Sequence, residues 1–317
     1  MAIASGGMRL FAAVIRRLPV RVGYGVGRTL GTLVYCVDRV HRRMTLENLE
    51  RIFGREMTRA ERRRLARRVF RHLGYTAIEF CRIPQLRSDT LSSFVTFRGT
   101  ERVEHALRRG NGIVFISGHI GSWELMGPIA SLLGYPISLV VRPIDEPQID
   151  KIVEQYRQTH GTGVIEKKRA ALPILRRLAR GECVGILVDQ RAHREGIVLD
   201  FLGHPASTTT VPAELARRSE AAVIPVFAVR DGTGRITMVF EPELEVVRTD
   251  DPESDIVENS RRFQDAVERY VRRYPEQWLW PHERWKPPKP RHLRGYFRNQ
   301  RRQQDEDASA GAAVGRL

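Results

Sequence analysis

Short apolar runs that alternate with helical stretches constrain the fold more than any other feature of this chain. The runs are rich in β-branched residues and lie at residues 112–117, 137–141, 183–188 and 222–229. Runs of this length and composition are typical of buried strands in a parallel sheet. Helical patterns follow or separate them at residues 123–133, 147–160, 170–180, 212–219 and 256–271. This alternation predicts an α/β fold with helices on both faces of the sheet.

One further strand makes the predicted sheet mixed rather than wholly parallel. Residues 235–240 follow the turn-rich segment Asp231-Gly232-Thr233-Gly234 and should form a hairpin with the strand before it. We therefore expect a mixed, mainly parallel central sheet flanked by helices. Three regions are predicted: an N-terminal helical, membrane-associating region at 1–84, an α/β domain at 85–290, and a tail at 291–317 that is basic and then disordered.

Positive charge is concentrated at the two ends of the chain. The formal net charge is +16, and residues 1–75 hold 17 Arg, no Lys and five acidic residues. Eight further basic residues and no acidic residue occur between Arg284 and Gln304. Such a balance favours an anionic partner, which is either an anionic membrane surface or a nucleic acid. We expect the membrane surface and no nucleic acid, because the basic residues flank the α/β region and no nucleic-acid-binding motif is present.

The N-terminal region has the pattern of helices that lie on a membrane. Residues 10–37 are largely apolar, but they are interrupted by Arg16, Arg17, Pro19, Arg21 and Arg28. The stretch is therefore too broken to span a bilayer and suits an interfacial position better. The alternative is an amphipathic helix packed on a soluble domain.

Two local signals define helices within this region. Gly23, Gly27 and Gly31 share one helical face and would let another helix approach closely. The segment Thr58-Arg59-Ala60-Glu61 is a capping box that opens a long basic helix ending near Phe80.

The segment Ser117-Gly118-His119-Ile120-Gly121-Ser122-Trp123-Glu124 leaves a predicted buried strand, turns, and enters a helix. Active sites of α/β sheets gather beyond the carboxyl ends of strands. We predict that His119 is a general base and that Glu124, brought to the imidazole by a bend in the chain, orients it. Motifs for a covalent serine nucleophile, a P-loop, a zinc protease or a dinucleotide fold do not occur. Direct attack by a bound hydroxyl is therefore favoured, and hydrolysis by water is the rival.

Other polar residues follow the predicted strands and are candidates for substrate binding. Arg142 ends one strand and would bind an acceptor phosphate or an oxyanion. Asp189 and Gln190 end another, and would orient the acceptor or hold the catalytic loop; a purely structural role is the alternative. Gly203 and Thr208 bound a turn whose amides could receive an oxygen atom. The residues that form this candidate set are Arg142, Asp189, Gln190, Gly203 and Thr208.

Three tryptophans and three cysteines complete the sequence signals. Trp278, Trp280 and Trp285 lie in a Pro- and Lys-rich stretch, which suits a membrane interface, single-stranded nucleic acid or the core. The cysteines are Cys36, Cys81 and Cys183, with neither paired spacing nor an even number, so we expect no disulfide framework and no metal site.

The spacing His119-x4-Glu124 matches the H-x4-D/E motif of the lysophospholipid acyltransferase superfamily. More narrowly, the chain resembles the lipid A biosynthesis (lauroyl/myristoyl) acyltransferases from about Arg42 to Lys286. The residues that carry this resemblance, in order, are Asn48-Leu49, Gly118-His119, Val141-Arg142-Pro143, Asp189-Gln190, Phe201-Leu202-Gly203-His204-Pro205-Ala206, Thr208, Val223-Ile224-Pro225, Pro275-Glu276-Gln277-Trp278-Leu279-Trp280 and Arg284-Trp285-Lys286.

The resemblance implies transfer of a fatty acyl chain to a hydroxyl of a lipid A precursor on the cytoplasmic face of the inner membrane. It implies acyl carrier protein as donor, or coenzyme A in some relatives, with no metal and no other cofactor. A monotopic position or a single N-terminal anchor would fit. The alternative acceptor is another glycolipid or phospholipid, such as a phosphatidylinositol mannoside acylated from acyl-CoA. A basic protein that binds nucleic acid without catalysis is the remaining alternative. The sequence carries no signal for oligomeric state, acyl chain length or acceptor hydroxyl.

Overall fold

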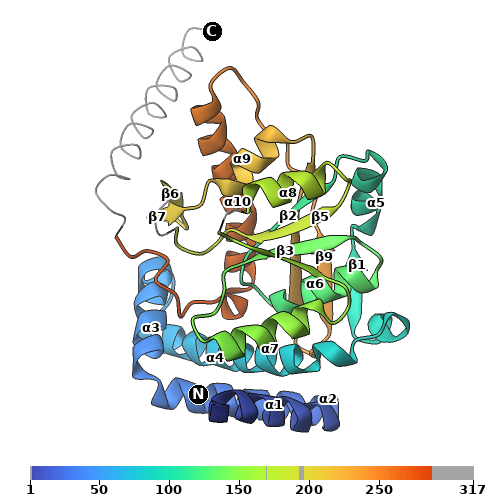
Figure 1. Cartoon of the computed structure of the whole chain (residues 1–317). Helices are drawn as coiled ribbons and strands as arrows, with labels where there is room; N and C mark the ends of the chain where they lie inside the picture. Colours follow the sequence, from blue (N-terminus) through green and yellow to red (C-terminus); the bar gives the residue numbers. More distant parts are fainter. Residues whose placement is uncertain (1, 169, 193–195, 288–317) are drawn as a thin grey trace.

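The computed structural model describes residues 2–168, 170–192 and 196–287, with side chains from Gly6 onward. The predicted tail at 291–317 lies outside the described residues. A seven-stranded sheet with the order β1-β9-β8-β2-β5-β3-β4 forms the centre of the molecule (Figure 1). Its strands are β1 (Val95–Arg98), β2 (Ile113–Ser117), β3 (Ile137–Val141), β4 (Gly163–Glu166), β5 (Cys183–Leu187), β8 (Ala222–Arg230) and β9 (Ile236–Phe240).

The sheet is mixed and mainly parallel, as the sequence predicts. β8, β2, β5, β3 and β4 run parallel to one another. β9 returns antiparallel to β8 after the turn at 231–234, and β1 pairs parallel with β9 at the edge. The central strand β2 is buried along its whole length, which explains its continuous apolar run.

Helices cover both faces of this sheet and enclose two apolar cores. Side chains of β2 alternate between them, with Phe115 in one core and Ile116 in the other. The first core lies under α5 (Thr100–Arg108) and α6 (Trp123–Leu132). The second lies under α8 (Ala171–Leu178), α9 (Val211–Arg218) and α10 (Pro252–Arg273), and α7 (Pro147–Gln158) connects β3 with β4. The α/β fold class is therefore confirmed.

Four N-terminal helices form a layer of their own against the α/β domain. They are α1 (Ala2–Arg17), α2 (Val20–Val37), α3 (Arg39–Phe53) and α4 (Arg59–Arg82), and α1 and α2 lie outermost in Figure 1. The capping box predicted at Thr58 and Glu61 is present at the start of α4. Gly27 and Gly31 are buried against α4, where added Cβ atoms would meet the carbonyl oxygens of Gly74 and Phe70. The predicted close approach of two helices is thus confirmed. No helix among the described residues is long and apolar enough to cross a bilayer.

Some elements escaped prediction because they are short or polar. The strands β1 and β4 have four residues each, and the two-stranded sheet of β6 (Ile197–Phe201) and β7 (His204–Thr208) contains Asp200, His204 and Pro205. Short 3-10 helices at Ile83–Gln85, Ser88–Ser93 and Pro275–Gln277 were also missed.

The tryptophan cluster decides among the three sequence-based interpretations in favour of the core. Trp278, Trp280 and Trp285 are at most 5% exposed and contact one another in the core. Neither a membrane-interface nor a nucleic-acid role suits side chains so fully enclosed. The aromatic and basic spacing was a misleading signal, since Arg284 in the same stretch is itself buried, against Ser207 and Thr208.

Candidate active site

The turn between β2 and α6 carries His119, as the sequence predicts. The chain leaves β2 at Ser117 and enters α6 at Trp123. Gly121 has a positive φ of 64°, and a Cβ there would overlap the Ala228 carbonyl, so only glycine fits this position. The imidazole lies beside the edge of the Trp123 ring, with ring centroids 5.6 Å apart. His119 is therefore held at the carboxyl end of the central strand.

Asp189, rather than Glu124, is the carboxylate that contacts His119. Its Oδ1 accepts from His119 Nδ1 at 2.8 Å, and its Oδ2 accepts from the His119 backbone N–H at 2.7 Å. Trp278 Nε1 donates to the same Oδ2 at 2.8 Å. We expected Asp189 to orient the acceptor or hold the loop; with only 2% of its side chain exposed, it holds the imidazole. The adjacency of β2 and β5 in the sheet brings together residues that are 70 apart in sequence.

The ionisation of Asp189 follows from these contacts. Burial alone would raise the pKa of this carboxyl. The neighbouring imidazole and the hydrogen bonds from His119 and Trp278 outweigh burial and lower the pKa to about 2. Asp189 is therefore an anion at neutral pH and fixes the ring proton of His119 on Nδ1.

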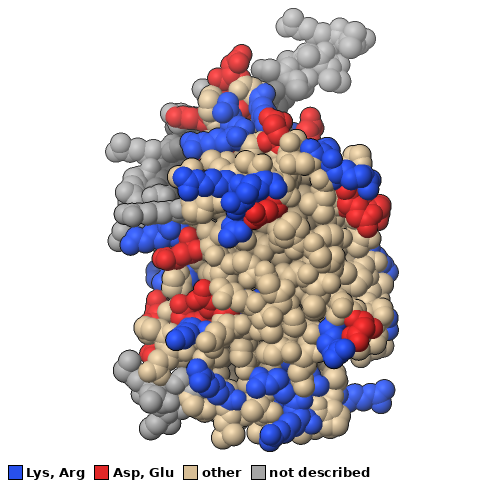
Figure 2. Space-filling model, turned by 45° about the vertical axis from the view of Figure 1, so that its right-hand side comes forward, with Lys and Arg blue, Asp and Glu red and all other residues tan. Residues whose placement is uncertain are grey.

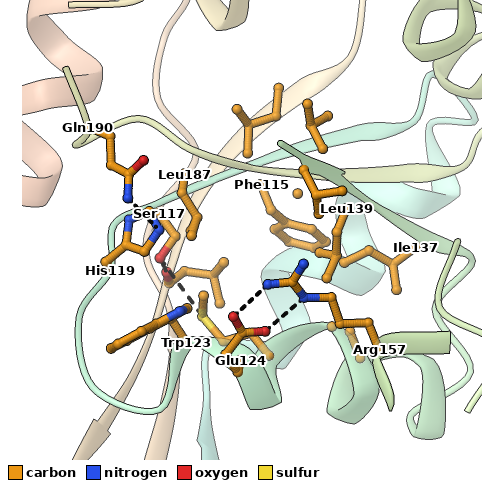
Figure 3. Close-up of a pocket in the computed structure, with 18 of the residues that line it drawn as sticks. Phe115, Ser117, His119, Trp123, Glu124, Ile137, Leu139, Arg157, Leu187 and Gln190 are labelled. Carbon is orange, nitrogen blue, oxygen red and sulfur yellow. Dashed lines mark hydrogen bonds and ion pairs between the residues drawn. The ribbon is translucent and has the colours of Figure 1, made fainter. Parts of the chain in front are cut away.

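The other ring nitrogen of His119 is the one available for chemistry. With Nδ1 protonated, Nε2 carries a lone pair, and the Gln190 side-chain amide lies 3.2 Å from it (Figure 3). Gln190 is exposed, so a substrate hydroxyl can take the place of its amide. His282 lies nearby, accepts from the Arg191 backbone N–H, and is neutral because burial lowers its pKa to about 4.

Glu124 has a different partner from the one expected. It is in the first turn of α6, as predicted, but its carboxylate pairs with Arg157 of α7 through two hydrogen bonds of 2.6 and 2.9 Å (Figure 3). Arg157 of α7 holds Glu124, whereas Asp189 occupies the Nδ1 side of His119, so the two carboxylates have separate partners. Glu124 and Arg157 both line the same cavity as His119.

This cavity has a volume of about 340 Å³ and lies between α6 and strands β3, β5 and β8. Its volume falls within the range of small-molecule sites in proteins. The deep wall is apolar and includes Phe115, Met126, Ile137, Leu139 and Phe240. Gly127 and Gly185 open the space beside Leu139, since a Cβ on either would crowd that side chain. The cavity therefore combines a polar entrance at His119 with an apolar interior.

Cations line the rim of the cavity. Arg142 and Lys167 stand at the carboxyl ends of adjacent strands, where the Lys167 backbone N–H donates to the Val141 carbonyl at 2.7 Å. Desolvation and the Arg142 charge lower the pKa of Lys167, although the residue is exposed at the rim. Glu124 is the only acidic residue of the described lining, and Arg157 already pairs with it. The rim is thus suited to an anionic group.

Three of the five predicted binding residues do not line the cavity: Asp189, which contacts His119, and Gly203 and Thr208. Gly203 forms the tip of the β6–β7 hairpin, and the Thr208 hydroxyl bonds Ala206 and Arg284 in the core. The neighbouring Thr209 lines the cavity instead. The physical reason is that β6 and β7 form a separate small sheet, where the buried Arg284 binds the Ser207 carbonyl and the Thr208 hydroxyl. Of the cavity residues, Arg157, Lys167 and Thr209 were missed by sequence reasoning, and none has a local signal that would reveal it.

Comparison with known proteins now identifies the family. The model of the bacterial lipid A biosynthesis acyltransferases matches residues 8–287. This chain belongs to that family. Its members that were compared carry acyltransferase names, so the protein is an acyltransferase.

Relatives with assigned names include several enzymes of lipid A synthesis. A lipid A biosynthesis lauroyltransferase of Escherichia coli is 26% identical over 278 residues, covering 86% of this chain and 88% of the relative. A lipid A biosynthesis acyltransferase of Haemophilus influenzae is 27% identical over 186 residues, 58% of this chain and 57% of the relative. A phosphatidylinositol mannoside acyltransferase of Mycolicibacterium smegmatis is 23% identical over 65% of this chain and 67% of the relative. The resemblance drawn from the motifs is confirmed at the level of family.

Proposed function

We propose that this acyltransferase moves a fatty acyl chain from an acyl thioester, carried by acyl carrier protein, to a hydroxyl of a lipid A precursor. The observation that carries the proposal is the Asp189–His119 pair at the entrance of an apolar cavity. A fixed tautomer leaves His119 Nε2 free to act as a base, and the cavity offers space for a hydrocarbon chain.

The proposed reaction uses His119 twice. The acceptor hydroxyl replaces the Gln190 amide at Nε2, and its proton passes to Nε2 as the oxygen attacks the thioester carbonyl. Asp189 stabilises the imidazolium that forms. When the carbon–sulfur bond breaks, the imidazolium returns the proton to the leaving thiolate. An ester and a free thiol result, and no covalent acyl-enzyme is required.

The Glu124–Arg157 pair has a supporting role in this proposal. Both side chains are about four-fifths enclosed and face the cavity beside the apolar wall. The carboxylate fixes the Arg157 guanidinium in one orientation, from which a donor can reach an oxygen of the bound thioester. Glu124 then acts on the substrate through Arg157 instead of through His119.

The cationic rim supports a phosphorylated acceptor. Arg142 and Lys167 follow adjacent strands, and among the described residues the one salt bridge to either of them joins Arg142 to the exposed Asp145 at 3.4 Å. A phosphate at this rim would keep a neighbouring sugar hydroxyl within reach of His119, which suits a lipid A precursor.

A phosphatidylinositol mannoside acyltransferase, with acyl-CoA as donor, is the second candidate. The similarity to the mycolicibacterial relative favours it specifically. Its acceptor also carries a phosphate and free sugar hydroxyls, so the same cavity entrance would serve.

The test is acyl transfer by the purified protein in detergent micelles. The protein is supplied with acyl-acyl carrier protein or acyl-CoA, and with a lipid A precursor or a phosphatidylinositol mannoside. We expect a mass increase of one acyl chain on the lipid A precursor, with acyl carrier protein as the better donor. Acylation of the mannoside alone would favour the second candidate. Release of free fatty acid without acylation of either lipid would reject both in favour of hydrolysis.

We further propose that the outer helices α1 and α2 rest on the anionic inner membrane surface. Nine of the eleven large hydrophobic side chains that are exposed in the described structure lie between Leu10 and Val40. Figure 2 shows Lys and Arg side chains among uncharged residues at this lower end of the molecule. Apolar side chains beside Arg residues are the features by which a helix lies in a headgroup layer.

A matched pair of leucines tests the membrane contact. Leu33 of α2 is 55% exposed and Leu172 of α8 is 56% exposed. We expect Leu33→Ser to weaken binding to phosphatidylglycerol vesicles about fivefold, because about 1 kcal/mol of apolar transfer is lost, and Leu172→Ser to leave it unchanged. Vesicle sedimentation measures both. Equal effects of the two substitutions would argue against docking through α2.

A further inference from the structure

A buried charged cluster lies between the helical layer and the turn that carries His119. Arg230, at the end of β8, is 7% exposed, and its Nη2 bonds both carboxylate oxygens of Glu79 at 2.6 Å. The guanidinium also contacts the rings of Tyr24 and Tyr75, which belong to α2 and α4. The proposed reaction uses none of these side chains.

This cluster reaches the turn through two hydrogen-bonded contacts. Arg230 Nη2 donates to the Ser122 hydroxyl at 3.0 Å, and Arg230 Nη1 lies 2.7 Å from His72 Nδ1. An arginine can only donate, so His72 accepts at Nδ1 and carries its proton on Nε2. That Nε2–H then donates to the Gly121 carbonyl at 3.2 Å. Burial and the Arg230 charge hold the pKa of His72 well below its usual value, which keeps this ring neutral.

The contacted positions control where His119 points. Gly121 is two residues beyond His119, and its N–H donates to the Gln277 carbonyl while the Ser122 N–H donates to the Ala228 carbonyl. These two bonds fix the amides of the turn. His72 of α4 binds the Gly121 carbonyl, and Arg230 at the end of β8 binds the Ser122 hydroxyl. Thr76 provides one weaker contact of 3.4 Å to the same carbonyl.

We propose that His72 and Arg230 are positioning residues that set the turn of His119, and that the helical layer thereby completes the active site. The proposal rests on the general-base role given to His119. Displacement of a catalytic group by about 1 Å can lower a rate about 100-fold. Loss of the Gly121 contact is expected to let the turn move, which loosens the bond between His119 and Asp189.

The test compares two substitutions of His72 with a control substitution of another histidine, His204. His72→Leu removes the donor to Gly121, whereas His72→Gln keeps a side-chain N–H donor and an oxygen that can accept from Arg230. His204 serves as the control, because its Nε2 also lies near a backbone carbonyl, that of Arg51, far from the turn. Initial rates of acyl transfer are measured per folded molecule, below the unfolding temperature of each variant.

We expect His72→Leu to lower kcat about 100-fold with KM for either substrate within twofold. His72→Gln should recover kcat to within about fivefold of the wild type, and His204→Leu should not change it.

Outcomes that contradict the proposal can be told apart from failure of the proposed function. A wild-type kcat in folded His72→Leu would overturn the positioning role while leaving His119 as the base. If His72→Leu and His72→Gln lose activity only in proportion to the loss of folded protein, the cluster stabilises the fold and does not position His119. Wild-type rates in His119→Ala would instead overturn the general-base role on which the proposal rests.

Discussion

Replacement of Asp189 by Asn is expected to lower kcat for acyl transfer by about 10³- to 10⁴-fold, close to the effect of His119→Ala. The asparagine has nearly the same shape but no charge, so it stabilises neither the required tautomer nor the imidazolium. Initial rates with saturating acyl-acyl carrier protein measure the loss. KM values should change by a few fold at most, since Asp189 is enclosed and does not line the cavity.

The matched comparison for Asp189→Asn is Glu124→Gln, which is equally conservative. Glu124 pairs with Arg157 and not with the imidazole. Removing either partner should therefore lower kcat by a similar factor. We expect the double variant Glu124→Gln/Arg157→Gln to be no slower than either single variant, as for residues that act as one unit. Losses that multiply in the double variant, together with a near-normal Asp189→Asn enzyme, would show that Glu124 orients His119 after all.

The pH dependence of the enzyme follows from the same pair. The pKa of Asp189 is lowered to about 2 in the folded protein, below the value of about 3.9 for an unfolded chain. Its ionised form therefore stabilises the fold above pH 4, and this contribution is lost only as the pH falls through about 2. Between pH 5 and 8 the charge of Asp189 does not change, so titration of this carboxylate should alter neither activity nor stability in that range.

The second large effect is on stability and concerns the contact of α2 with α4. Gly31→Ala should lower the free energy of unfolding by about 2–4 kcal/mol, because the new methyl group would overlap the Phe70 carbonyl and backbone cannot move away cheaply. Gly25→Ala on the same helix should instead raise it by about 0.5–1 kcal/mol, since nothing lies within 4 Å and alanine favours helix.

Chemical unfolding in detergent, followed by circular dichroism, measures both glycine variants. Similar changes in the free energy of unfolding for Gly25→Ala and Gly31→Ala would indicate that α2 and α4 do not pack through backbone contact. The Gly31 variant should also lose activity if the helical layer sets the turn of His119, because Tyr24 of α2 donates to Glu79 at 2.8 Å and so joins the Arg230 cluster.

Sequence patterns predicted the parts of the fold that local physics determines. The buried strand 113–117, the capping box at Thr58 and the hairpin around 231–234 each depend on residues close together in the chain. The position of His119 in a turn after a strand was predicted for the same reason. Membership of the family followed from many ordered motifs, which the family comparison confirmed.

Long-range pairing could not be predicted in this way. Asp189 reaches His119 because β5 lies beside β2 in the sheet, while β3 and β4 lie beyond β5, and no local pattern encodes that order. The partner of Glu124 likewise depends on the docking of α7 against α6. The sequence left the place of the tryptophans near 280 open, because burial depends on what folds around them and the same spacing of aromatic and basic residues also occurs at interfaces.

The positions of the tryptophans and cysteines allow two separate fluorescence measurements, one from the tryptophans and one from a dye attached to a cysteine. All four tryptophans lie at or after position 123: Trp123 is beside His119, Trp278 donates to Asp189, and the other two are packed against Trp278. Intrinsic fluorescence will therefore follow the surroundings of His119 and Asp189. Of the three thiols, Cys36 on α2 is exposed, whereas Cys81 and Cys183 are buried. A dye on Cys36 would report the proposed contact of the outer helices with lipid, so that this contact and the entry of substrate near His119 can be timed independently in one chain.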